Sequence, residues 1–165
     1  MALDNRPRSI SRYGTAAGTG ALAALLLVGV CGSPMYAGWV RDTDPNGAGG
    51  WFLQLLAWPA WQLHADDSSR SVLATDLRAV LLVVLAVALL YLLPAAQVAR
   101  VQGSASQFLS GWAAYVLAAG FSALLSALLG PGGSLLAAFQ GTGTGVTYGF
   151  FAGWIIGLAS LGGRA

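Results

Sequence analysis

The feature that most constrains this chain is a long uncharged stretch over residues 101–163. In a lipid environment the backbone must satisfy its own hydrogen bonds, and a helix does so within a single segment. A membrane-spanning helix needs about 20 predominantly apolar residues. The stretch has room for two such helices, and its Gly-Pro-rich sequence at 130–134 is typical of a turn between them. We therefore expect spans over about 108–129 and 135–161.

Composition places the rest of the chain in the same class. Only 8% of the residues are charged, against about 25% in ordinary soluble domains. Two more apolar segments cover about 15–40 and 79–99, separated by a long outer loop over 41–78. The sequence therefore predicts an all-α integral membrane protein with four transmembrane helices, forming a single four-helix membrane domain over residues 1–165.

The first apolar segment has two interpretations. A basic start before a short apolar core is typical of a secretory signal peptide, and a lipoprotein signal ending at Cys31 is a variant of this. However, Val30 is bulky where such a signal has a small residue, and the uncharged stretch continues well past a normal signal core. We favour a retained first transmembrane helix, kinked near its outer end by Pro34.

The outer loop contains an aromatic segment with tryptophans at 51, 58 and 61. Residues 51–64 include Pro59 and are too few to span a bilayer. Tryptophan prefers the headgroup level of a membrane. We therefore expect an interfacial or re-entrant segment between the first and second spans, with Trp51, Trp58 and Trp61 at the membrane surface or against a partner.

The distribution of arginine predicts the orientation, because cytoplasmic loops of membrane proteins are enriched in basic residues. Five arginines lie on the side of the two termini and three on the side of the outer loop. Both termini are therefore expected in the cytoplasm, with the chain in a cytoplasmic (inner) membrane. Every basic side chain is arginine and every acidic one is aspartate, a bias we attribute to a GC-rich bacterium.

Small residues recur every four positions in the last two spans, and such rows allow close approach of membrane helices. The glycine row of the fourth span consists of Gly141, Gly145, Gly149, Gly153 and Gly157. The small-residue row of the third span consists of Ser110, Ala114, Ala118, Ser122 and Ser126. We expect the two rows to face each other in an antiparallel hairpin; the alternative is that they pack against a second copy of the chain.

Residues able to carry chemistry are sparse. His64 is the only histidine, Cys31 is the only cysteine, and no acidic or basic side chain lies near the middle of a predicted span. Proton-coupled carriers normally place ionisable groups there. Hydrolase, kinase and paired-cysteine signatures are absent, so the sequence predicts no catalytic residue, no metal site and no bound cofactor. The scattered arginines do not indicate a nucleic-acid partner.

The leading interpretation is a non-enzymatic accessory, scaffold or assembly subunit of a bacterial membrane complex. Its expected partners are the lipid bilayer and other membrane subunits or copies of itself. The alternative is a small oligomeric channel or carrier, with the Gly/Thr stretch 140–147 lining the path. A subunit that anchors a membrane enzyme is a third possibility.

Overall fold

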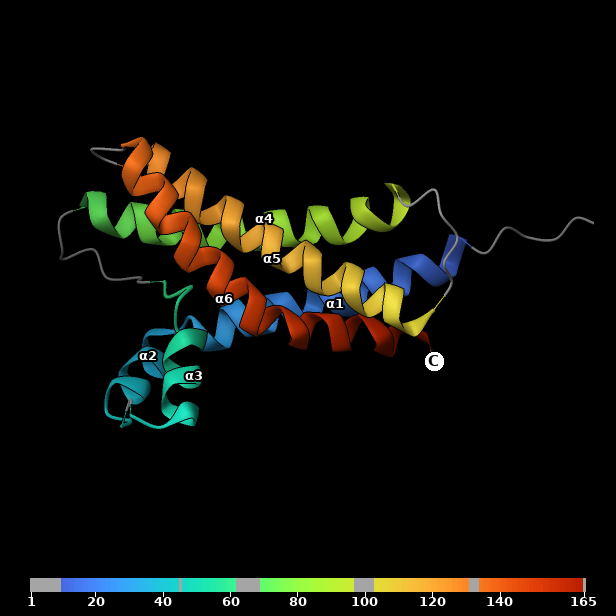
Figure 1. Ribbon diagram of the computed structural model, residues 1–165, viewed down its shortest axis with the longest axis horizontal. Helices are drawn as coiled ribbons and strands as arrows, with labels where there is room; N and C mark the ends of the chain where they lie inside the picture. Colours follow the sequence, from blue (N-terminus) through green and yellow to red (C-terminus); the bar gives the residue numbers. More distant parts are fainter. Residues whose placement is uncertain (1–9, 45, 62–68, 97–102, 131–133, 165) are drawn as a thin grey trace, which may run out of the picture.

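The computed structural model (Figure 1) describes residues 10–44, 46–61, 69–96, 103–130 and 134–164. All regular structure within these ranges is helical. The elements are α1 (Ile10–Cys31), α2 (Pro34–Arg41), α3 (Ala48–Leu56), α4 (Ser69–Ala96), α5 (Ser104–Leu129), α6 (Leu135–Leu161) and the short 3-10 helix η1 (Gly162–Arg164). The prediction of an all-α chain is confirmed for the part that the structure describes.

Three of these helices are long and apolar enough to cross a membrane, over Thr75–Leu93, Ser104–Leu129 and Ala138–Leu161. A fourth candidate exists only when Ala16–Cys31 and Pro34–Arg41 are taken together, and these two pieces meet at an angle of 59°. The described chain is therefore compatible with a multi-pass membrane protein that has three candidate spans.

The break between α1 and α2 follows from the local sequence. Pro34 is the first residue of α2, a position where its missing N–H costs no hydrogen bond. Ser33 caps the new helix, since its hydroxyl accepts a hydrogen bond from the backbone N–H of Tyr36 at 3.2 Å. The kink expected at Pro34 is thus a complete break followed by a capped second helix.

The four long helices lie roughly along the long axis of the molecule (Figure 1). Helix α5 packs against both α4 and α6, while α1 packs against α4, α6 and η1. The beginning of α1 and the end of α6 therefore lie at the same end of the bundle. Helices α2 and α3 pack on each other at the opposite end.

The interior of the bundle is built mainly from small side chains. Ala86, Ala114 and Ala118 are fully buried, whereas Leu26 and Phe139 are two-thirds exposed. Membrane helices use this arrangement, because small residues allow backbones to approach while lipid surrounds the large apolar groups. The packing therefore agrees with the membrane class that the composition predicts.

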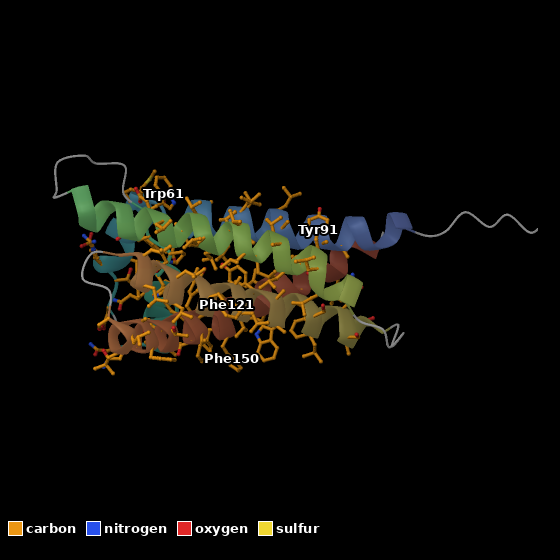
Figure 2. All side chains as sticks on the ribbon, turned by 90° about the horizontal axis from the view of Figure 1, so that it is seen from above. Trp61, Tyr91, Phe121 and Phe150 are labelled. Carbon is orange, nitrogen blue, oxygen red and sulfur yellow. The ribbon has the colours of Figure 1, made fainter. Side chains whose placement is uncertain are left out.

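The segment that follows α3 returns to the end of α1. The backbone N–H of Trp61 donates to the carbonyl of Gly32 at 3.0 Å, and its indole N–H donates to the carbonyl of Val28 at 3.3 Å. The Tyr36 hydroxyl of α2 donates to the carbonyl of Leu53 in α3 at 3.1 Å. Figure 2 shows Trp61 towards the end of the bundle where α4 begins, with Tyr91 farther along α4. These contacts fix the short helices to the bundle.

Helix ends differ from the expected spans. Helix α4 begins at Ser69, well before the predicted start at residue 79, and continues past Pro94 to Ala96. Helix α5 begins at Ser104, four residues before the predicted start. Apolar composition marks only the part of a helix that suits lipid, whereas polar residues can extend the same helix beyond it.

Candidate functional site

The glycine row of α6 lies against α5. A Cβ atom built on Gly145 would lie 2.6 Å from the Ala119 carbonyl oxygen, and one built on Gly149 would lie 2.8 Å from the Val116 Cα. Such distances are shorter than real Cβ contacts allow, so only glycine fits at these positions without a shift. The backbones of α5 and α6 therefore approach more closely than side chains would permit.

The same contact continues along the helix. A Cβ on Gly153 would lie 2.8 Å from Trp112 Cδ1, and one on Gly157 would lie 2.8 Å from Phe108 Cδ2. Gly141 is different, since its nearest neighbour, the Ala127 Cβ, would lie 4.0 Å away in ordinary contact. The close part of the seam between α5 and α6 thus runs from Gly145 to Gly157.

Residues of α5 outside the predicted small-residue row lie nearest to the glycine row of α6. The atoms nearest to the glycines belong to Phe108, Trp112, Tyr115, Val116, Ala119, Ala123 and Ala127. The predicted row of Ser110, Ala114, Ala118, Ser122 and Ser126 supplies none of these atoms. Helix α5 packs against both α4 and α6, so its faces are divided between two neighbours. Spacing within one helix does not reveal that division.

Two tyrosines fill the centre of the bundle. The Tyr115 and Tyr148 hydroxyls lie 2.8 Å apart and share a hydrogen bond, and both side chains are fully buried. A buried hydroxyl without a partner is costly, so each tyrosine satisfies the other. The sequence shows two tyrosines in neighbouring spans but does not show that they meet.

Trp58 and Arg78 extend this pair towards α4. The Trp58 ring stacks on Tyr148 with centroids 4.9 Å apart. The Arg78 guanidinium lies 4.6 Å from the centroid of Trp58 and donates to the Trp58 carbonyl at 2.9 Å. An arginine near the start of a span is expected to reach outwards to the membrane surface. Here it turns into the protein, because the Trp58 ring and carbonyl bind it there.

A cavity of about 310 Å³ lies beside this stack. Its lining includes Trp58 and Arg78, Ser126 of α5, and Gly141 and Thr144 of α6. It lies where α4 begins, α5 ends and α6 begins. The cavity therefore combines one cationic group with hydroxyl and apolar groups near one end of the bundle.

The Gly/Thr stretch of α6 presents two faces. Gly145 is buried, whereas Gln140, Gly143, Thr144 and Thr147 are exposed. The Thr147 hydroxyl donates to the carbonyl of Gly143 at 2.9 Å within its own helix. The exposed face continues along α6 with a spacing of alternately four and three residues. This outward row consists of Gln140, Thr144, Thr147, Phe151, Trp154 and Leu158.

The three tryptophans of the outer loop occupy different settings. Trp58 and Trp61 are partly buried and pack against the core. Trp51 is 45% exposed and contacts Phe151 edge-on, with centroids 5.0 Å apart. Trp51 therefore borders the outward row of α6. Their predicted position at the membrane surface stays a prediction.

The remaining candidates for polar chemistry do not form a site in the described ranges. His64 lies outside the described residues. Cys31 is a free, partly buried thiol at the end of α1. No group of three or more His, Cys, Asp or Glu side chains with metal-binding geometry occurs in the part of the chain that the structure describes.

Comparisons with known proteins give no family for this chain. No protein-family model, no curated protein and no solved structure matches it significantly.

Proposed function

We propose that this chain is a four-span subunit of a bacterial cytoplasmic-membrane complex, without catalytic activity of its own. The bent pair of α1 and α2 would form the fourth span, and the arginine distribution would place both termini in the cytoplasm. Helix α3, which contains Trp51, would then lie at the outer surface. In this arrangement the protein acts by holding membrane partners together.

The observation that carries this proposal is the outward row of α6. Its upper part, from Gln140 to Thr147, consists of polar and small residues that the chain's own helices leave uncovered. Such residues gain little from contact with lipid tails, but they let a second helix approach and form hydrogen bonds. Alternating steps of four and three keep one face of a helix towards a partner along its length. A transmembrane helix of another subunit fits this surface.

The second candidate function, an oligomeric channel or carrier, draws on the same surface. Thr144 and Thr147 are exposed on α6, so copies arranged around this face would line a path with hydroxyl groups. A path through a single copy is disfavoured, because the Tyr115–Tyr148 pair fills its interior. The accessory role needs no such ring of copies, and we prefer it.

In the test, the native complex is extracted gently from variants with substitutions on different faces of the chain. The measurement is whether the partner still co-purifies. Gly143 is exposed beside the outward row, about one turn from both Gln140 and Thr147. A Cβ on Gly143 would have no atom within 4 Å, so Gly143→Leu should leave the bundle folded and obstruct only an outside partner. Val84→Leu on α4 is the matched control, since Val84 is 56% exposed on a different helix. We expect Gly143→Leu to lose the co-purifying partner and Val84→Leu to retain it.

Two results would overturn the proposal. One is a wild-type chain that is extracted as a lone monomer from native membranes. The other is full partner retention by Gly143→Leu. Flux of ions or small solutes through liposomes that contain only the purified chain, lost in Gly143→Leu, would instead favour the channel.

A further inference from the structure

The cavity beside Arg78 has features that the proposed assembly role does not use. Arg78 lies within the candidate span Thr75–Leu93, three residues from its start. Ionisable residues inside spans are costly and generally face a functional site. In this chain the guanidinium lines an open cavity of about 310 Å³ and also contacts Trp58.

The guanidinium is held in place but not fully satisfied. One terminal nitrogen donates to the Trp58 carbonyl, and the planar group lies over the Trp58 ring. The Arg78 Nε atom is buried and has no hydrogen-bond acceptor among the described residues. A guanidinium has five N–H donors, so these contacts leave donors for a ligand. A buried charge is stabilised when an opposite charge pairs with it.

We propose that this cavity binds a phosphate-type oxyanion, with Arg78 as its charged donor. Among the described residues that line the cavity, Arg78 carries the only charge. Arginine binds phosphate through two parallel N–H···O bonds, because its planar guanidinium holds two donors side by side. Thr144 supplies a hydroxyl on the α6 side, and Trp58 holds the guanidinium in position. Thr144 also belongs to the outward row of α6, so the cavity borders the proposed partner surface.

Size and position agree with a lipid headgroup or a free phosphate ion. Ligand pockets for small molecules start at about 300 Å³, and this cavity is at that lower limit. Three residues of helix advance about 4.5 Å, so Arg78 lies close to the membrane edge of its candidate span. The phosphodiester of a phospholipid occupies that level, and inorganic phosphate could reach it from water.

The experiment measures phosphate-bearing ligands on the purified full chain in a phosphate-free maltoside detergent. Native mass spectrometry with added phosphatidylglycerol tests the lipid source, and the shift in Tm with added inorganic phosphate tests the free ion. Arg78→Gln should weaken binding at least about tenfold, and Arg78→Lys should weaken it less. Arg41→Gln is the matched control, because Arg41 is exposed on α2 and does not line the cavity.

A second variant keeps the test decisive if Arg78→Gln fails to fold. Gly141→Leu would fill the cavity from α6, where an added Cβ lies 4.0 Å from the nearest atom. It leaves the contact between Arg78 and Trp58 intact and should also lose the ligand. Binding of either phosphatidylglycerol or inorganic phosphate with these losses supports the site and identifies its source. Unchanged binding in Gly141→Leu, or no phosphate binding by the wild-type chain, would overturn it.

Discussion

The close seam between α5 and α6 leads to a quantitative prediction for Gly149. A Cβ at this position would lie 2.8 Å from the Val116 Cα, 2.9 Å from the Ala119 Cβ and 3.3 Å from the Tyr115 carbonyl oxygen. Carbon atoms pack best at about 3.5–4.0 Å, so α5 and α6 must separate by about 1 Å to admit even alanine. Backbone atoms cannot swing away as a flexible side chain would.

The expected cost follows from this forced separation. Overpacking a well-packed core typically costs about 1–3 kcal/mol, occasionally more. We expect Gly149→Ala to lower the free energy of unfolding by about 1–2 kcal/mol, and Gly149→Leu by about 3 kcal/mol or more. The larger side chain also disturbs the neighbouring Tyr115–Tyr148 hydrogen bond, since Tyr148 is the adjacent residue.

Gly29→Ala is the matched control for this prediction. A Cβ on Gly29 in α1 would have no atom within 4 Å, yet the substitution makes the same change in helix propensity. The difference between the two alanine variants therefore reports the steric clash alone. The measurement is reversible unfolding in mixed detergent micelles, followed by circular dichroism. Equal stability of Gly149→Ala and Gly29→Ala would refute the steric argument.

Two further predictions concern the core and the topology. Tyr115→Phe and Tyr148→Phe should each lower the free energy of unfolding by about 1–2 kcal/mol, because each leaves one buried hydroxyl unpaired. The double variant should cost less than the sum of the two, and additive effects would contradict the shared hydrogen bond. In a Cys31→Ser background, Asn46→Cys should react with a membrane-impermeant maleimide in intact cells. Ala105→Cys, at an exposed position near the start of α5, should react only after permeabilisation, and the reverse pattern would contradict the proposed orientation.

Much of the bundle could be predicted from the absence of charge. The stretch from 101 to 163 has no charged residue, and most of α5 and α6 lies within the two spans expected there. The Gly-Pro-rich sequence at 130–134 correctly divides the stretch into two helices. Hydropathy is a property of residues along the chain, so it predicts where the apolar helices lie better than it predicts which helices pack together.

The candidate site could not be predicted in the same way. Arg78 and Trp58 lie on either side of a connection, and their sequence positions do not indicate that one lies over the other. The same holds for Tyr115 and Tyr148, whose pairing depends on how far one helix slides along its neighbour. Helix α1 posed a different problem, because Pro34 predicts a kink but not the 59° angle between two separate helices.

The central claim is that the outward row of α6 contacts another membrane protein, and crosslinking in native membranes tests it most directly. A photoreactive side chain at Thr147, on the outward row, should form a specific crosslinked product with a partner chain. The same group at Val84 of α4, which is also exposed, should give only lipid adducts. Crosslinking to protein at Val84 alone, or lipid adducts alone at Thr147, would contradict the claim.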